Sequence, residues 1–181
     1  MKRRISFKPR FWVILAVVAL FSISLWVSGQ NGEETPKFEE SVAAVVEVDE
    51  EKEFILDIPM SCELQEELYE ATEEFGVDYY VMVALIDRET KFNNVQGDGG
   101  DSYGYCQIQP KWWYGLMVEI GATDLNVPKD NFRTACAIMA RLTEKHNSIE
   151  GALVEYNQGY YEGISTRYSR EIIENAARYK A

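Results

Sequence analysis

Glu89 is the residue of this sequence whose position most favours acid–base chemistry. It directly follows an almost wholly apolar stretch, residues 79–88, and precedes a segment rich in glycine, aspartate and asparagine, residues 93–104. Asp78 and the apolar stretch predict a buried helix that ends close to Glu89. Burial and the negative end of the helix dipole both raise the pKa of a carboxyl group. A carboxyl group that stays protonated near neutral pH can serve as a general acid.

The alternative role for Glu89 is a surface ion pair at the end of the helix. Arg88 and Lys91 are close in sequence, and ion pairs also perturb the pKa of carboxyl groups. The choice therefore depends on what accompanies Glu89 elsewhere in the chain. Four segments with distinctive residues occur in order: ALIDRET at 84–90, SYGYCQIQ at 102–109, DLNVPKDNF at 124–132 and ALVEYNQG at 152–159.

Together these segments resemble the soluble lytic transglycosylase family and its goose-type lysozyme relatives, over about residues 61–179. The resemblance implies that Glu89 is the catalytic acid and base, and that Tyr156 and Asn157 help to orient it. It further implies that a set of residues lines the sugar cleft and binds the substrate: Thr90, Ser102, Gly104, Gln107, Tyr156 and Asn157.

The chain departs from the family pattern at two places. Thr90 stands where the family usually has serine, which keeps the hydroxyl, and Tyr105-Cys106 stands where it has Leu-Met, which changes the packing of the cleft. Gly104 suits a turn, and its missing side chain would also let a glycan approach closely. Several aromatic residues could stack on sugars, with core packing as the alternative role: Tyr103, Tyr105, Trp112, Trp113, Tyr160 and Tyr161.

The resemblance implies cleavage of the β-1,4 bond between N-acetylmuramic acid and N-acetylglucosamine in peptidoglycan. Glu89 would protonate the glycosidic oxygen and then accept the proton of the muramoyl C6 hydroxyl, which closes on C1 to give a 1,6-anhydro end. A hydrolase of the goose-lysozyme kind is the alternative, in which a second carboxylate about 6.5–9.5 Å from the acid activates water. Asp98 and Asp101 are the candidates for it, although both also suit turns. A third alternative, a non-catalytic module that binds the cell wall, fits an intact Glu89 poorly.

The charge of the chain argues against nucleic acid as a partner. The formal net charge is −12, and all 30 acidic residues follow residue 29, whereas five of the 18 basic residues precede it. Such an acidic surface repels phosphate backbones and is compatible with an uncharged or aminosugar polymer. Neither a Cys/His spacing typical of a metal site nor a glycine-rich nucleotide loop occurs, so no metal and no cofactor is expected. His146 is expected to be a solvated polar residue in a loop.

Residues 1–29 are predicted to be a basic cytoplasmic end followed by a membrane helix. Residues 11–27 are 17 apolar or small residues without a charge, near the lower limit for a membrane helix and longer than most signal-peptide cores. An uncleaved anchor is therefore favoured over a cleaved signal peptide, with the basic flank inside. Acid-rich residues 30–60 are predicted to be a solvated tether, and residues 61–181 a domain outside the cytoplasm. Whether a protein of the envelope machinery is a partner stays open.

The hydrophobic pattern from residue 61 onward predicts a mainly α, lysozyme-like domain. Five to six short helices are expected around one buried helix, residues 79–88, with a small loop or hairpin at residues 93–104. Tyr168 is expected to face inward on the last helix. Start and stop residues place the other helices from Ser61 to Gly76, from Pro110 to Gly121, from Asn131, from Ser148, and from about Thr166 to Tyr179.

The three cysteines do not fix a redox state. Cys62, Cys106 and Cys136 allow one disulfide with a free thiol, or three reduced thiols. The spacing of these residues does not decide between the two arrangements.

Overall fold

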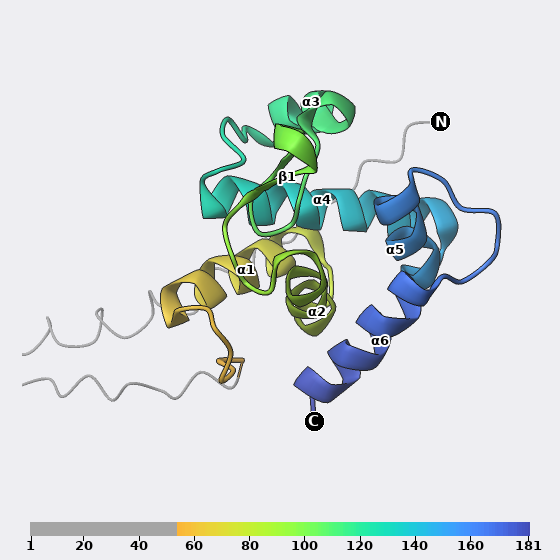
Figure 1. Ribbon diagram of the computed structural model, residues 1–181, viewed down its shortest axis with the longest axis horizontal. Coiled ribbons are helices and arrows are strands. Elements are labelled where there is room, and N and C mark those ends of the chain that lie inside the picture. Colours follow the sequence, from red (N-terminus) through yellow and green to blue (C-terminus); the bar gives the residue numbers. More distant parts are fainter. Residues whose placement is uncertain (1–53) are drawn as a thin grey trace, which may run out of the picture. The chain divides into compact units, whose positions relative to one another are not determined.

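The computed structural model describes residues 54–181, which form a mainly α-helical unit with one small hairpin (Figure 1). The predicted membrane helix at residues 11–27 and residues 30–53 of the predicted tether lie outside the described residues. Within the described part of the chain, no helix combines the length and the apolar character needed to cross a membrane.

The last residues of the predicted tether belong to the folded unit. Phe54, Leu56 and Ile58 pack against the hydrophobic core. The ring of Phe54 stacks on the ring of Tyr69, with 4.0 Å between the ring centroids. The tether prediction is therefore wrong for residues 54–60, because the acidic composition of the whole window concealed an alternating apolar pattern at its end.

The first two helices begin and end at their capping residues. α1, Cys62–Phe75, begins after Ser61, whose side chain accepts a backbone N–H of the first turn, and ends at Gly76. α2, Tyr79–Thr90, begins after Asp78, which caps the helix in the same way. Both predicted starts are confirmed. α2 extends two residues beyond its predicted end, so the candidate acid lies in its final turn.

A two-stranded hairpin follows α2, as the glycine and aspartate content of this segment predicts. β1, Gln96–Gly97, pairs antiparallel with β2, Ser102–Tyr103, and Gly97 lies opposite Ser102. A short 3₁₀ turn, η1 at Asp98–Gly100, connects the two strands. This connection places Asp98, a candidate for the second carboxylate, at the tip of the hairpin.

The next two helices both begin with proline. α3 is Pro110–Ile120 and α4 is Pro128–His146. The predicted start of α4 at Asn131 is wrong, because Pro128 occupies the first turn, where its missing N–H has no helical partner to lose. Asn131 lies inside the helix and is fully buried.

Asn131 connects α4 to two loops through its side-chain amide. Its Oδ1 accepts the backbone N–H of Cys106 at 2.9 Å. Its Nδ2 donates to the carbonyl oxygens of Tyr103 at 2.9 Å and Leu125 at 3.0 Å. One buried side chain therefore fixes the segment after the hairpin against α4.

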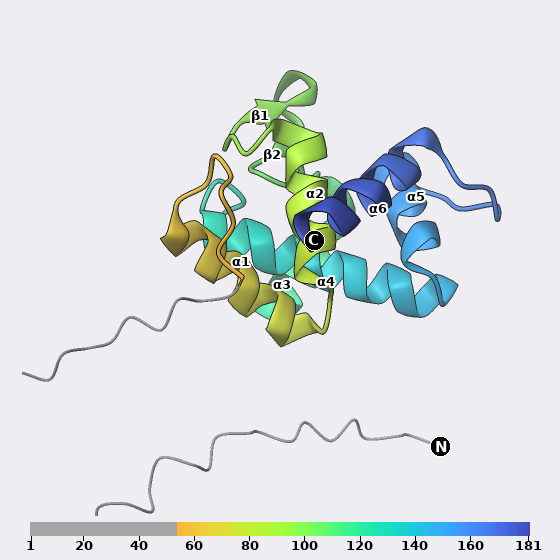
Figure 2. The ribbon, with the colours of Figure 1, turned by 90° about the horizontal axis from the view of Figure 1, so that it is seen from below.

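The last two helices are α5, Ile149–Gln158, and α6, Arg167–Tyr179, and their predicted starts are confirmed. Residues 82–86 of α2 and 135–139 of α4 are at most 3% exposed. α4 packs along α1, α3 and α5, and α2 packs against α1 and α6 (Figures 1 and 2). α2 and α4 are therefore both central, whereas the sequence predicted a single buried central helix at residues 79–88. Among the cysteines, Cys62 is exposed, Cys106 and Cys136 are buried, and all three are free thiols.

Candidate active site

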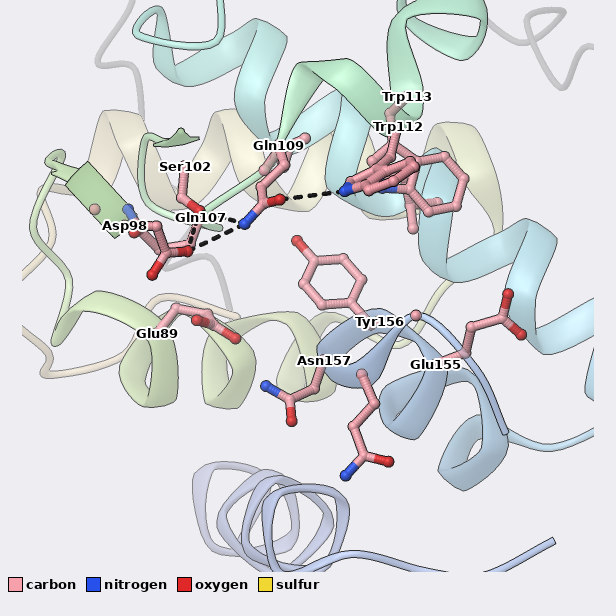
Figure 3. Close-up of a pocket in the computed structure, with 15 residues that line it drawn as sticks. Glu89, Asp98, Ser102, Gln107, Gln109, Trp112, Trp113, Glu155, Tyr156 and Asn157 are labelled. Atoms are coloured by element: carbon pink, nitrogen blue, oxygen red, sulfur yellow. Dashed lines mark hydrogen bonds between the residues drawn. The ribbon is translucent and has the colours of Figure 1, made fainter. Parts of the chain in front are cut away.

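A cleft of about 720 Å³ opens beside the C-terminal end of α2 (Figure 3). Its volume lies within the range of roughly 300–1,000 Å³ typical of ligand-binding pockets. The walls come from α2, the hairpin and the segment after it, the start of α3 and the end of α5. Eight residues singled out in the sequence line the cleft together: Glu89, Asp98, Ser102, Gln107, Trp112, Trp113, Tyr156 and Asn157.

The Glu89 carboxyl group is partly exposed to the cleft and otherwise enclosed by protein. The Tyr168 hydroxyl of α6 donates a hydrogen bond to Glu89 Oε1. Burial raises the pKa of Glu89 above its ordinary value, and the nearby Asp98 adds to the rise. The hydrogen bond from Tyr168 and the charge of Arg88 act in the opposite direction without reversing the shift. Glu89 therefore holds its proton to a higher pH than an ordinary glutamate, as its position predicts.

Neither of the cations beside Glu89 in sequence pairs with it. Arg88 Nε lies 3.4 Å from Glu171 Oε2, and Lys91 Nζ lies 2.9 Å from Asp87 Oδ1. The surface ion-pair alternative for Glu89 therefore does not describe the structure. The carboxyl group is left with a neutral hydrogen-bond donor as its direct partner.

Tyr156 does not make the predicted contact with Glu89. Its ring lines the cleft (Figure 3), but its hydroxyl donates to the carbonyl oxygen of Cys106 at 2.7 Å. Tyr168 takes the expected place on Glu89. Burial raises the pKa of both tyrosines well above its ordinary value, so both hydroxyls remain protonated donors. Helical spacing marked Tyr168 as inward-facing, but spacing cannot show that its hydroxyl reaches a carboxyl group.

Gln107 lines the cleft while its amide nitrogen is held by the backbone. Its Nε2 donates to the carbonyl oxygens of Val95 at 3.0 Å and Gly104 at 2.9 Å. Its Oε1 lies against Gly97, where a Cβ atom would come within 2.0 Å of that oxygen. Gln107 therefore joins the hairpin to the segment after it, and the close approach requires glycine at position 97.

Thr90 and Gly104 support the cleft wall and do not contribute to its lining. Thr90 Oγ1 donates to the carbonyl oxygen of Tyr105 at 2.9 Å, which connects α2 to the segment after the hairpin. Gly104 has a φ of 75°, and a Cβ atom there would lie 2.2 Å from Asn131 Nδ2 and 2.6 Å from the Leu125 carbonyl oxygen. Both residues were expected to bind substrate. The structure gives them packing roles, because their neighbours are protein atoms.

The two candidate second carboxylates have different surroundings. Asp98 lines the cleft, and its Oδ2 accepts hydrogen bonds from Ser102 Oγ at 2.6 Å and Gln109 Nε2 at 3.1 Å. Asp101 does not line the cleft, and its Oδ2 lies 3.1 Å from Lys111 Nζ at the surface. Of the two, Asp98 is therefore the one placed to reach a bound substrate.

A chain of hydrogen bonds continues from Asp98 to the first turn of α3 (Figure 3). Gln109 Nε2 also donates to Ser102 Oγ at 3.1 Å, and Gln109 Oε1 accepts the indole N–H of Trp112 at 3.2 Å. Trp112 and Trp113 both line the cleft. Gln109 ends the SYGYCQIQ segment, but the sequence did not mark it as a site residue, because its partners Asp98, Ser102 and Trp112 come from three different segments.

A polar cluster lies where α5 meets α4. His146 Nε2 lies 2.5 Å from Glu155 Oε2, and Lys145 Nζ lies 2.8 Å from the same carboxylate. Burial raises the pKa of Glu155, but the hydrogen bonds from Lys145 and His146 outweigh it and lower the pKa below its ordinary value. The expectation of a solvated His146 in a loop is wrong, because this residue ends α4 and its ring packs on Tyr161 with 5.0 Å between centroids.

The described residues contain no group of three or more His, Cys, Asp or Glu side chains arranged to hold a metal ion.

Comparison with models of protein families identifies the family of this domain. The transglycosylase SLT domain matches residues 67–173, a range that includes both Glu89 and Tyr168. The chain therefore belongs to the transglycosylase SLT domain family, which confirms the resemblance seen in the sequence. A comparison with curated proteins found no match. In general terms, the family assignment makes this a transglycosylase-type protein that acts on peptidoglycan.

Proposed function

We propose that this protein is a peptidoglycan lytic transglycosylase. It cleaves the β-1,4 bond between N-acetylmuramic acid and N-acetylglucosamine and leaves a 1,6-anhydromuramoyl end. The observation that carries the proposal is the Glu89 carboxyl group, whose pKa is raised by burial and whose direct partner is the Tyr168 hydroxyl rather than a cation. Such a group can give up a proton in one step and take one back in the next.

In the first step Glu89 protonates the glycosidic oxygen. Because Oε1 accepts the hydrogen bond from Tyr168, the proton of the neutral acid resides on Oε2. The bond between muramoyl C1 and the glycosidic oxygen breaks, and the proton leaves with the N-acetylglucosamine hydroxyl. Positive charge develops at C1, where the carbonyl oxygen of the muramoyl acetamido group can bond in turn.

In the second step the ionised Glu89 accepts the proton of the muramoyl C6 hydroxyl. O6 forms a bond to C1 as the acetamido oxygen departs, which gives the 1,6-anhydro ring. Glu89 is then protonated again, and no water is consumed, so one carboxyl group suffices. Between the steps the hydrogen bond from Tyr168 stabilises the carboxylate and holds its position.

Asn157 is the residue best placed to recognise the glycan itself. It lines the cleft at the end of α5 and makes no hydrogen bond with another described residue through its side chain. Its amide offers both a donor and an acceptor, which complement the acetamido groups of both sugars. Ser102 and Gln107 line the opposite part of the cleft (Figure 3), where Ser102 Oγ and Gln107 Nε2 are already bonded within the protein.

A hydrolase is the second candidate, and the position of Asp98 in the cleft favours it. In that reaction Asp98 would take a proton from water as the water attacks C1. Its Oδ2 already accepts hydrogen bonds from Ser102 and Gln109, so this oxygen is engaged within the protein and less available to a water molecule. For this reason we place the transglycosylase reaction first.

We further propose that the domain works outside the cytoplasm, attached through residues 11–27 as a single-pass anchor. The support is the apolar, uncharged character of that segment and the basic residues before it. Peptidoglycan lies on the outer side of the cytoplasmic membrane, which agrees with this arrangement. Cleavage after the apolar segment would release the same domain on the same side.

Mass spectrometry of digested peptidoglycan tests the proposed reaction. The wild-type protein should release 1,6-anhydromuramoyl products, and Glu89→Gln should lower the rate at least about 10²–10⁴-fold, the contribution typical of general acid–base catalysis. The amide that this substitution introduces keeps an oxygen that can accept from Tyr168, so the variant should still bind peptidoglycan. Reducing ends from the wild-type protein would favour the hydrolase with Asp98. Intact strands with retained binding would indicate a non-catalytic wall-binding module.

A further inference from the structure

Trp112 exposes its side chain within the cleft rather than away from it. Its exposed fraction is 72%, and that of Tyr114 on the same helix is 70%. An exposed aromatic residue alone indicates nothing, because folded proteins expose much apolar surface. Trp112 lines the cleft, however, whereas Tyr114 does not. The exposure of Trp112 is therefore directed at the space that a substrate would occupy.

The Trp112 indole is held in a fixed orientation despite this exposure. Its Nε1 donates to Gln109 Oε1 at 3.2 Å. The Gln109 amide has one orientation, because the indole N–H can only donate and so faces Oε1, while Nε2 donates to both Asp98 Oδ2 and Ser102 Oγ at 3.1 Å. The chain of bonds thus runs in one direction from the indole to the carboxylate (Figure 3). A side chain that is fixed before binding loses little conformational freedom when a ligand binds.

Most of the Trp112 side chain remains exposed. Lys111 Nζ lies 5.6 Å from the centre of the Trp112 ring and is itself held by Asp101 at 3.1 Å. Apart from this ammonium group, little covers the side chain, whose exposed fraction is 72%. The neighbouring Trp113 packs partly against the core instead.

Trp112 and Glu89 lie at separate parts of the cleft (Figure 3). Glu89 comes from the last turn of α2 and Trp112 from the first turn of α3. A polymer whose reacting bond lies at Glu89 would therefore place a neighbouring unit of the chain, and not the reacting bond, beside Trp112.

We propose that Trp112 is a glycan-binding platform, on which one pyranose ring stacks at a distance from the bond cleaved at Glu89. In a β-1,4-linked aminosugar the axial C–H bonds form an apolar face, while the hydroxyl and acetamido groups project from the edge. The indole supplies a flat apolar face on which this apolar face of the sugar can stack, and Gln109 accepts the hydrogen bond of the indole N–H. This inference rests on the proposed function, because it takes the strand cleaved at Glu89 to run through the cleft.

Binding of solubilised, uncross-linked peptidoglycan strands to the Glu89→Gln protein tests the platform. In that background Trp112→Ala should weaken binding by about tenfold, the scale expected for one aromatic stacking contact. Trp112→Phe, which keeps a flat ring, should retain most of the affinity. Tyr114→Ala is the matched control, since it removes an equally exposed aromatic residue of α3 that lies outside the cleft. Equal affinities of the Trp112→Ala and Tyr114→Ala proteins would overturn the proposal.

Product analysis of the wild-type protein separates this inference from the proposed function. If the wild type cleaves strands and Trp112→Ala binds like the control, the platform fails and the function stands. If the wild type cleaves nothing but Trp112→Ala loses binding, the platform stands and the function fails. If Trp112→Ala lowers the melting temperature, the affinities of Trp112→Leu and Trp112→Phe are compared instead, because both keep apolar volume and only phenylalanine keeps a ring. Tighter binding by Trp112→Phe supports the platform, and equal binding overturns it.

Discussion

The Tyr168 hydroxyl donates a hydrogen bond to Glu89 Oε1 although 79 positions separate the two residues. The Arg88 guanidinium carbon lies 5.6 Å from the centre of the Tyr168 ring, and Arg88 pairs with Glu171 of the same helix, α6. The contact between α2 and α6 therefore supplies the hydrogen-bond donor of Glu89 and a partner for Arg88, in addition to the nearby charge of Asp98. The orientation and the pKa of Glu89 depend on how these two helices pack.

Tyr168→Phe should lower turnover by about tenfold, the scale of a hydrogen bond to a charged group, and move the alkaline limb of the pH–rate profile upward. The hydrogen bond lowers the pKa of Glu89, so without it that pKa rises further and the protonated acid persists to higher pH. Initial rates of product release across pH check this. Tyr156→Phe is the control, because its hydroxyl bonds to the Cys106 carbonyl oxygen. A similar shift in both variants would contradict the assignment.

Glu89→Gln should be as stable as the wild type in acid and more stable at neutral pH. Burial raises the folded-state pKa of Glu89 above 4.5, so the folded state binds the proton more tightly than the unfolded state. That contribution is fully present below the unfolded pKa and is lost as pH rises through the folded pKa. Thermal unfolding of both proteins across pH measures the difference. A variant that is less stable at neutral pH would show that Glu89 is stabilised as a carboxylate.

Asp98→Asn should reduce cleavage by less than about tenfold, since it weakens the hydrogen bonds from Ser102 and Gln109 without removing the acid. Asp101→Asn should leave the rate unchanged, because Asp101 pairs with Lys111 at the surface. Rates on isolated peptidoglycan give the comparison. Loss of activity in Asp98→Asn as complete as that in Glu89→Gln would establish Asp98 as the base of a hydrolase.

Asn131→Ala should lower the free energy of unfolding by about 2–4 kcal/mol, because the buried Cys106 N–H and Leu125 carbonyl oxygen lose their partner and the Tyr103 carbonyl oxygen loses one of its two donors. Denaturant unfolding measures the change. Asn94→Ala serves as the control, since Asn94 makes one exposed hydrogen bond to the Asn126 carbonyl oxygen, and its loss should cost less than about 0.5 kcal/mol. Similar losses in both variants would mean that the amide of Asn131 contributes little.

Reporter fusions test the proposed topology. A reporter joined after residue 30 should be active when it requires export and inactive when it requires the cytoplasm, because the basic residues before residue 11 favour the inner side. The opposite pattern would reject both the anchor orientation and access to peptidoglycan.

Local signals predicted the fold where one residue decides the local conformation. Ser61, Asp78 and Ser148 each begin a helix because a side-chain oxygen accepts a free backbone N–H. The same rule wrongly predicted Asn131 as the start of a helix, because its side-chain amide instead bonds to the backbone of two loops and holds them against α4. The prediction that residues 54–60 belong to the tether was also wrong, because their apolar side chains are buried only by packing against the folded domain, including α1.

The residues of the candidate site likewise fall into those that the sequence could predict and those that it could not. Glu89 could be predicted because its helix and the segment after it are adjacent in sequence. Tyr168 and Gln109 could not, because their roles arise from contacts between elements distant along the chain. Spacing marks which face of a helix is buried, but it does not say which group that face meets.

α6 follows every other helix of residues 54–181 and supplies the tyrosine that holds the acid. A chain that is synthesised from its N-terminus delivers α2 long before α6. Closing so long a loop costs conformational entropy that only the assembled domain offsets. The hydrogen bond to Glu89 is therefore absent until nearly the whole of residues 54–181 has been made. The Glu89 side of the cleft therefore gains its last hydrogen-bond donor only when the final helix of the described residues has packed.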